Sequence, residues 1–404
     1  MEPKIRLKGF SGEWEEKPLL DVVTLYNGLT YTPSDIRDRG TLVLRSSNVQ
    51  EGEIALSDNV YVKSDVATSP NVKKGDIIVV VRNGSRALIG KHAHIKEDMP
   101  NTVIGAFMAG MHTDEPEFMN ALLSTSSFDD EVNINLGATI NQITNGTFRS
   151  MKFHFPKKDE QKAIGAYFQH LDSLIQSTTK KIESLKQVKA ASLQSMFPQE
   201  GETTPRVRFK GFEGEWENKT LGECLTINNE RNQSNVYGIN DVLSVSDEVG
   251  VVNQIKLLGR SYAGKSVANY RVLKTNQIVY TKSPLKSKPY GIVKVNKGAV
   301  GIVSVLYAVY DTNENIYPDY IHYYFEPTHR INNYLLPLIN KGAKNTMNIS
   351  DEMALTGNIW IPSFDEQKKI ADYLQALDSQ IILQTQRLEK LKQIKSACLD
   401  NMFV

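Results

Sequence analysis

Two short segments carry residue types that could support metal-dependent hydrolysis. Glu160-Gln161-Lys162 and Glu366-Gln367-Lys368 each place a carboxylate two residues before a lysine. In many nucleases such a carboxylate holds Mg²⁺ while the lysine helps to activate water. Both segments stand in the first turn of a long helical pattern, where the helix dipole favours carboxylates. Because no partner aspartate on a neighbouring strand is evident, the pattern favours a structural role.

Other catalytic and metal-binding patterns are weaker still. His92 and His94 would point to one face of a strand, but no cysteine or third histidine is near in sequence, so phosphate contact or plain exposure is favoured over zinc binding. The glycines of Gly9-x-x-Gly12 and Gly211-x-x-Gly214 do not lead into a helix, as the loop of a methyltransferase or dinucleotide site would. We therefore expect a non-catalytic chain that binds no metal or cofactor itself.

Basic residues gather in one window of each half of the chain. Ten lysines and arginines, and no Asp or Glu, lie between Lys256 and Lys297. The counterpart from Lys73 to Lys96 holds six bases against Asp76 alone, although the net charge of the whole chain is only +1. Two basic faces suggest contact with one long anion at two places.

The elements that must position these windows are duplicated. Asp159-Glu160-Gln161-Lys162 recurs as Asp365-Glu366-Gln367-Lys368, and the same offset of 206 residues relates Met196-Phe197 to Met402-Phe403. Between these markers apolar positions step by alternating four and three, which predicts a coiled-coil helix in each half. The seam positions are Ile164, Phe168, Leu171, Ile175, Thr178, Ile182 and Leu185, and Ile370, Leu374, Leu377, Ile381, Gln384, Leu388 and Leu391.

The region before each helix starts and ends with similar segments in both halves, but the sequence between these segments differs. Residues 4–15 recur as 205–217, a glycine-bracketed aromatic followed by Trp, which indicates a turn with apolar anchors. Strands are predicted at 41–49, 75–82 and 151–155 with a helix at 115–124, and in the second half at 241–246, 277–281, 291–295 and 299–307 with a helix at 319–325. Similar flanking segments around different internal sequences indicate that the two domains have different recognition tasks.

The short polar linker at 198–205 decides the expected architecture, since the second helix must run back antiparallel to the first. Each helix of roughly 38 residues would be about 55 Å long. We expect an α+β fold: two mixed α/β domains at opposite ends of an antiparallel two-helix coiled coil, with a pseudo-twofold internal repeat. The expected divisions are 1–156, 157–197, 198–205, 206–362 and 363–404.

Composition agrees with a multidomain soluble protein. The chain has 404 residues with 40% apolar content, enough for at least two cores. Its longest near-apolar run, 300–310, is far below a membrane span, and Met1 is followed by no apolar stretch. Cys224 and Cys398 cannot supply a disulfide framework or a zinc site. A cytoplasmic location is expected.

The whole chain resembles the DNA specificity (S) subunits of type I restriction-modification systems. In both halves a variable domain is followed by Pro-x-x-Asp-Glu-Gln-Lys, at 156–162 and 362–368, and a heptad helix ending near Met-Phe. Segments 137–141, 342–348 and 74–78 also carry the resemblance. The second half departs from the last of these, having Thr-Asn-Gln-Ile-Val at 275–279.

The resemblance implies a recognition subunit of a phage-defence system. Each domain would be a target-recognition domain that reads one half of a bipartite, asymmetric double-stranded DNA site, and the coiled coil would set the unread spacer. The helices would dock two S-adenosylmethionine-dependent adenine methyltransferase subunits, and ATP-dependent restriction and translocase subunits would join them. S-adenosylmethionine, ATP and Mg²⁺ would belong to those partners, and phage inhibitors that mimic DNA could occupy the same basic faces.

Candidate DNA contacts follow from charge and position, because Arg and Lys can pair with guanine edges and phosphates, and Asn with adenine. In the first half they are Arg45, Ser46, Asn48, Arg82, Asn83, Ser85, Arg86, Thr139 and Asn141; in the second they are Lys265, Lys282, Ser283, Lys286, Lys288, Tyr290, Lys344 and Asn345.

Three alternatives remain at this point. The chain could be the specificity component of a related system whose methylase and nuclease are fused. It could instead be a coiled-coil scaffold that joins two protein-binding heads, which the acid-free basic window disfavours and which the salt dependence of DNA binding would distinguish. An enzyme acting alone is disfavoured by the lack of a cofactor loop or metal constellation.

Overall fold

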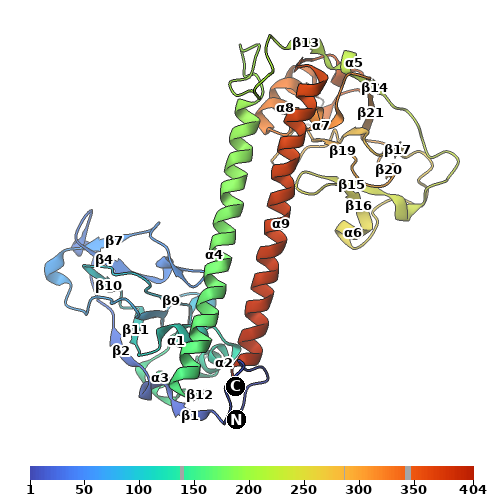
Figure 1. The fold of residues 1–404 in the computed structure, drawn as a ribbon. Helices are drawn as coiled ribbons and strands as arrows, with labels where there is room; N and C mark the ends of the chain where they lie inside the picture. The colour runs from blue at the N-terminus through green and yellow to red at the C-terminus, as the bar shows by residue number, and fades with distance from the viewer. Residues whose placement is uncertain (137–140, 286, 342–346) are drawn as a thin grey trace. The chain divides into compact units, whose positions relative to one another are not determined.

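The structure, a computed structural model, describes residues 1–136, 141–285, 287–341 and 347–404. It consists of two compact units: unit 1 comprises residues 1–180 and 385–404, and unit 2 comprises residues 181–384. The long helices α4 (Lys158–Ser195) and α9 (Phe364–Met402) each contribute one part to each unit (Figure 1). Both helices are confirmed within two residues of the predicted limits.

Unit 1 is built on two four-stranded sheets. The central strand β8 (Ile77–Val80) is buried on both faces, because Ile77 and Val79 pack toward the helices whereas Ile78 and Val80 pack toward the second sheet. The first sheet is antiparallel, in the order β2 (Thr24–Asn27), β11 (Met108–His112), β8 (Ile77–Val80), β9 (His92–His94); the second has the order β10 (Thr102–Ile104), β4 (Thr41–Leu44), β7 (Val60–Val62), β3 (Ile36–Arg37). The helices are α1 (Pro116–Leu122), α2 (Ser126–Asn135) and α3 (Asn145–Ser150), and a hairpin joins β5 (Val49–Gln50) to β6 (Glu53–Ile54).

Unit 2 repeats this plan with different residues. Ile278 and Tyr280 belong to the core beneath the helices, while Val279 faces the second layer of strands. The central sheet has the order β14 (Leu225–Ile227), β21 (Ala308–Thr312), β18 (Ile278–Tyr280), β19 (Val293–Val295). Beside it lie the pairs β17 (Arg271–Leu273) with β20 (Gly301–Val303) and β15 (Leu243–Ser246) with β16 (Gly250–Asn253). The remaining elements are α5 (Leu221–Cys224), α6 (Gln254–Leu258), α7 (Pro318–Phe325), α8 (Thr328–Leu335), β22 (Asn340–Lys341) and β23 (Met347–Asn348).

The Asp-Glu-Gln-Lys glutamates hold the repeated N-terminal motif in place. Arg6 donates to both oxygens of Glu160 at 2.8 Å and to the carbonyl of Gly12 at 2.6 Å. Arg208 and Glu366 form the same pair in unit 2, at 2.6 and 2.8 Å. The two carboxylates are almost fully buried. Both oxygens of each carboxylate are therefore occupied by a bidentate guanidinium, which agrees with a structural role.

Short antiparallel strand pairs follow each of these motifs. In unit 1, β1 (Glu15–Pro18) pairs with β12 (Lys152–Phe155), and in unit 2, β13 (Glu217–Thr220) pairs with β24 (Asn358–Ile361). The strand after the repeated Trp thus joins the strand that leads into each long helix. This pairing explains why the two motifs recur together.

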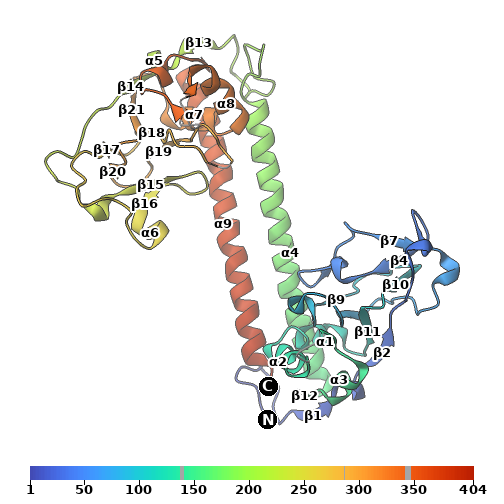
Figure 2. The ribbon, with the colours of Figure 1, turned by 180° about the vertical axis from the view of Figure 1, so that it is seen from behind.

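Antiparallel packing of α4 and α9 is confirmed within each unit (Figures 1 and 2). In unit 1 the Asp172 carboxylate pairs with the Lys395 ammonium at 2.6 Å, and in unit 2 Asp378 pairs with Lys189 at the same distance. The two pairs correspond under the offset of 206 residues. The expected placement of the heads at opposite ends of the helices, and the domain divisions, stay predictions.

The repeated Met-Phe at the end of each long helix packs into the core of the globular domain that belongs to the other repeat. Phe403, from the second repeat, lies against Trp14 and Phe118 in unit 1, with ring centroids 6.2 and 5.5 Å apart. Phe197, from the first repeat, lies against Trp216 and Tyr320 in unit 2, at 6.4 and 5.5 Å. The predicted apolar role of the two tryptophans is confirmed, since both are buried.

Some predicted elements need correction. The strand expected at 41–49 ends at Leu44, because the Asn48 side chain accepts from the Arg45 amide and closes a tight turn over Ser46–Asn48. The strand expected at 299–307 ends at Val303, where the chain turns before β21. Helices α2 and α8 and strands β2, β11, β14 and β21 were not predicted. Among the described residues, no helix is long and apolar enough to span a membrane.

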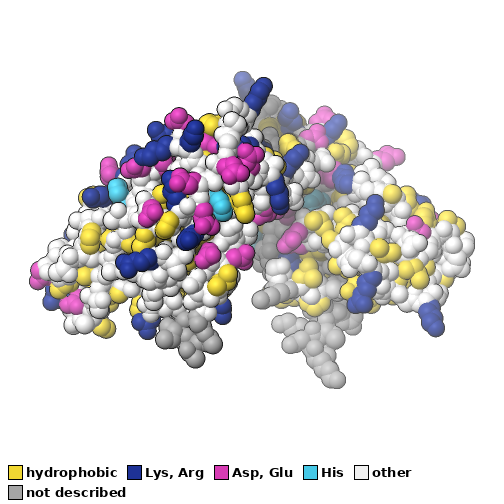
Figure 3. All heavy atoms as spheres, turned by 90° about the horizontal axis from the view of Figure 1, so that it is seen from below, with side chains coloured by type: hydrophobic (Ala, Val, Ile, Leu, Met, Phe, Trp, Pro, Cys, Tyr) yellow, Lys and Arg dark blue, Asp and Glu magenta, His cyan; other side chains and the backbone are white. Residues whose placement is uncertain are grey.

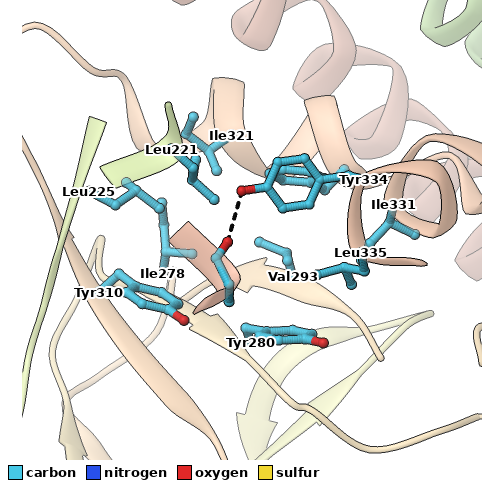
Figure 4. Close-up of a pocket in the computed structure, with 12 residues that line it drawn as sticks. Leu221, Leu225, Ile278, Tyr280, Val293, Tyr310, Ile321, Ile331, Tyr334 and Leu335 are labelled. Atoms are coloured by element: carbon cyan, nitrogen blue, oxygen red, sulfur yellow. Dashed lines mark hydrogen bonds between the residues drawn. The ribbon is translucent and has the colours of Figure 1, made fainter. Parts of the chain in front are cut away.

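A small cavity in the core of unit 2 is a packing gap and not a ligand site. Its volume is about 20 Å³, which is close to the space that one water needs. Figure 4 shows that apolar side chains and tyrosines surround it, and that the Tyr334 hydroxyl donates to a backbone carbonyl, that of Ala354, at 2.8 Å.

His322 on α7 is a pH-sensitive element of unit 2. Burial is the main reason why the pKa of His322 is lowered to about 3; the ammonium groups of Lys294 and Lys189 act in the same direction, while the Val293 carbonyl and Asp378 oppose it. In the unfolded chain the pKa of His is about 6.5. The unfolded state therefore binds more protons between pH 6.5 and 3, so stability is complete above pH 6.5 and falls as the pH decreases through this range.

Lowering the pH from 7 to 5 is expected to cost unit 2 about 2 kcal/mol through His322 alone. Chemical denaturation of the wild type and of His322→Gln at both pH values measures this contribution. The variant should lose correspondingly less stability between the two pH values. An identical loss in both proteins would contradict a neutral, buried His322.

Candidate nucleic-acid interface

Three loops of unit 1 meet around a groove of about 650 Å³. Strands β4 and β10 are parallel, so the loops after Leu44 and Ile104 begin at the same edge of their sheet. The end of β8 reaches the same place, because Val80 pairs with Met108 at the start of β11. The groove is lined by Leu29, Thr30, Tyr31, Pro33, Ile36, Arg45, Ser46, Ser47, Asp58, Asn83, Gly105, Ala106, Phe107 and Met108.

Hydrogen bonds hold these loops together. The Asn83 amide donates to the Ser46 hydroxyl at 3.0 Å, and the Asn141 amide donates to the Gly84 carbonyl at 3.3 Å. The Phe107 carbonyl accepts from the backbone amides after β8. The structure thus brings together six residues selected from the sequence: Arg45, Ser46, Arg82, Asn83, Ser85 and Asn141.

The structure does not place the other three candidates of the first half among these residues. Asn48 is fully buried, and its amide donates to the carbonyls of Ala55 and Asp58 at 2.9 and 3.2 Å, so it shapes the loop and presents nothing to DNA. Arg86 turns toward the end of α2, where it donates to the Asn133 carbonyl. Thr139 lies outside the described residues.

The rim of the groove combines charge with an exposed aromatic ring. The Arg45 guanidinium donates to the Asp58 carboxylate at 2.8 Å, and the exposed Arg82 guanidinium lies 5.2 Å from the centroid of the Phe107 ring. Phe107 is 53% exposed. Tyr31, Asp58 and Phe107 could not be identified as site residues from the sequence, since only the fold places them beside the basic residues.

The acid-free window of the second half is largely neutralised by acids from outside it. Six of its ten bases form ion pairs with carboxylates among the described residues. On the face of the whole molecule that Figure 3 presents, basic and acidic side chains are both visible. The electrostatic expectation therefore needs correction: the window is not one continuous basic surface. The pairs are Arg271 and Lys282 with Asp351, Lys274 with Glu230, Lys288 and Lys294 with Asp247, and Lys297 with Asp319.

Two candidates of the second half pack against the interior, one of them fully buried. The Lys288 ammonium is 2.9 Å from Asp247 and donates to the Glu326 carbonyl at 2.7 Å, and the residue is only 6% exposed. Tyr290 packs against the core, and its carbonyl accepts from the Tyr280 hydroxyl. The Lys288 ammonium is therefore engaged within unit 2, whereas Tyr290 is only partly buried.

The other candidates of the second half are more open. Lys282 is half-buried beside Asp351 in a left-handed backbone conformation, with φ of 47°, and Ser283 follows it. Lys265 is exposed, as are Lys256 and Arg260, which are not among the contacts predicted from the sequence. In the described part of the chain none of these three has a carboxylate within 4.0 Å. Lys286, Lys344 and Asn345 lie outside the described residues.

The two histidines of β9 are structural. His92 contacts the Gly90 carbonyl and the Ser124 hydroxyl at 3.2 and 3.1 Å, and His94 is only 7% exposed. Burial lowers the pKa of both imidazoles. The expected exposure or phosphate contact is therefore wrong. Among the described residues no group of three His, Cys, Asp or Glu side chains is arranged to hold a metal.

Comparison with known proteins agrees with the internal repeat. The family model described as type I restriction modification DNA specificity domain matches twice, at residues 11–187 and 213–393. The chain is 24% identical over 298 residues to the type I restriction enzyme StySPI specificity subunit of Salmonella potsdam, a match that covers 71% of this chain and 62% of that protein. Less than two thirds of that relative is therefore spanned.

Two further similarities extend over nearly the whole chain. The putative type I restriction enzyme MjaX specificity subunit of Methanocaldococcus jannaschii is 23% identical, with 96% of this chain and 92% of that protein covered. The crystal structure of the S subunit of a type I restriction-modification system from M. genitalium has a TM-score of 0.62 at 15% identity, covering 100% of this chain and 99% of that one, and so shares the fold. With a family model matched in both halves, the chain belongs to the type I restriction-modification DNA specificity domain family.

Proposed function

We propose that this chain is the DNA sequence-specificity subunit of a type I restriction-modification complex. The observation that carries the proposal is the double match to a DNA specificity domain, once in each half. The different contents of the two heads support the reading of two different half-sites, which together form a bipartite asymmetric target. The unit 1 groove with Arg45 and Arg82, and the exposed Lys256, Arg260 and Lys265 of unit 2, are the proposed DNA contacts.

The proposed role is recognition without catalysis. Two methyltransferase subunits would dock on the paired helices, and restriction and translocase subunits would complete the complex. S-adenosylmethionine, ATP and Mg²⁺ would be bound by those partners. The buried Arg6–Glu160 and Arg208–Glu366 pairs support this division, since the glutamates that resemble metal ligands are already occupied.

A map of methylated adenines tests the proposal. Cells that express the chain with its methyltransferase should show a two-part asymmetric motif, and cells whose chain lacks residues 203–364 should lose it, because the second recognition head is removed. Expression of the methyltransferase and of the shortened chain is confirmed by immunoblotting. An unchanged pattern of methylation would refute the proposal and favour a protein-interaction scaffold.

A further inference from the structure

The groove of unit 1 has walls that phosphate binding does not explain. At about 650 Å³ it is within the range of sites that enclose a small organic ligand. Tyr31 and Phe107 supply aromatic surface, while Arg45, Ser46 and Asp58 supply a few polar groups. Flat apolar walls with a few placed polar groups suit a planar heteroaromatic ring.

Phe107 is exposed and yet firmly positioned. Its carbonyl accepts from Val81 and Arg82 at 2.9 and 3.2 Å, and the amide of Gly105 donates to the Leu44 carbonyl at 2.8 Å. The Arg82 guanidinium lies over the ring, and the ring also lines the groove. An aromatic ring held this way is available for stacking on a base.

The polar groups of the groove present donors and an acceptor side by side. Arg45 and Asp58 are joined at 2.8 Å, and the Asp58 side chain is 62% exposed. The Arg45 Nε and Ser47 Oγ atoms are buried, and neither has a hydrogen-bond partner within the described part of the chain. Buried polar atoms are nearly always hydrogen-bonded. The edge of a nucleobase carries adjacent donors and acceptors that match this arrangement.

We propose that this groove binds one base of the target DNA that has left the duplex stack, with its ring against Phe107 and its edge toward Arg45 and Asp58. The inference rests on the proposed function and adds a distorted duplex as the substrate. This base is distinct from the adenine that the methyltransferase modifies. Stacking on Phe107 would offset part of the free energy needed to unstack the base.

The test uses the full chain in its methyltransferase complex and duplexes that carry the mapped DNA site. Each adenine, guanine and cytosine is replaced in turn by a fluorescent analogue that brightens when unstacked, and thymines are probed by permanganate oxidation. One position of the half-site read by unit 1, besides the methylated adenine, should become several-fold brighter or more reactive.

Variants of Phe107 make the test specific. Phe107→Ala should abolish the additional signal and weaken binding about 10-fold, as expected for loss of one stacked base, whereas Phe107→Tyr should retain both. Ile134→Ala, which removes another exposed apolar side chain of unit 1, should behave as the wild type. Thermal unfolding checks that each variant is folded.

The outcomes separate the two proposals. Tight, sequence-specific binding with no unstacked base other than the methylated adenine would overturn the groove assignment and leave the proposed function intact. The same conclusion follows if Phe107→Ala keeps the additional signal. Absence of any methylation motif would refute the proposed function itself.

Discussion

Replacement of both Arg45 and Arg82 by alanine is expected to weaken binding to the mapped DNA site at least about 30-fold. The two guanidiniums lie at the groove where the loops after β4 and β8 meet. An arginine in bidentate contact with a guanine contributes about 1–3 kcal/mol of discrimination, and about 1.4 kcal/mol corresponds to a factor of ten. Fluorescence anisotropy with the methyltransferase complex measures the change.

A charge-matched control separates specific contact from general attraction. Lys152 and Lys162 are also in unit 1, and their side chains are 60% and 65% exposed. Alanine at both positions removes the same formal charge and should change affinity less than about tenfold, because neither residue lines the groove. Equal losses in the two double variants would show that the groove arginines act only through net charge.

Phe197→Ala is expected to destabilise unit 2 by about 4 kcal/mol, within the range for deletion of a buried Phe side chain. Phe197 is fully buried between Trp216, Tyr320 and Tyr324. The Arg330 guanidinium also lies over its ring at 4.8 Å. Removing the ring leaves a cavity at the point where the end of α4 enters the core of unit 2. Chemical denaturation followed by hydrogen exchange measures the loss in each unit.

Two further variants calibrate this result. Phe403→Ala removes the corresponding ring from unit 1, where Trp14, Phe118 and Phe168 surround it, and should cost a similar amount there. Phe107→Ala removes an exposed ring and should change stability by less than about 0.5 kcal/mol. If Phe197→Ala were as mild as Phe107→Ala, the exchange of Phe side chains between repeats would not contribute to stability.

The features that repeat along the chain could be predicted without a structure. The seam from Ile164 to Leu185 is a pattern of local spacing, and most of its residues are buried as expected. The repeated Glu160 and Glu366 marked equivalent positions, although their arginine partners could not be identified. Arg6 is 154 residues from Glu160, and spacing within a helix says nothing about a contact so distant in sequence.

The pairing of charged side chains was the feature that the sequence predicted least well. The window from Lys256 to Lys297 contains no acid, yet Asp351 neutralises Lys282 from 69 residues away, and Asp247 neutralises Lys288. A count of charges along the chain cannot anticipate such pairs, because the charges that face one another are chosen by the fold. The same reason explains why Lys288 and Asn48 were selected as contacts and are instead buried.

The duplication, the two long helices and the family can all be predicted from residue types at fixed spacing along the chain. Which charges remain unpaired, and which side chains from five separate segments line the groove of unit 1, depends on the folded chain. That groove exists because parallel β4 and β10 end at one edge beside the end of β8. Strand order and direction are set by burial on both faces of the sheet, a long-range property that no single segment carries.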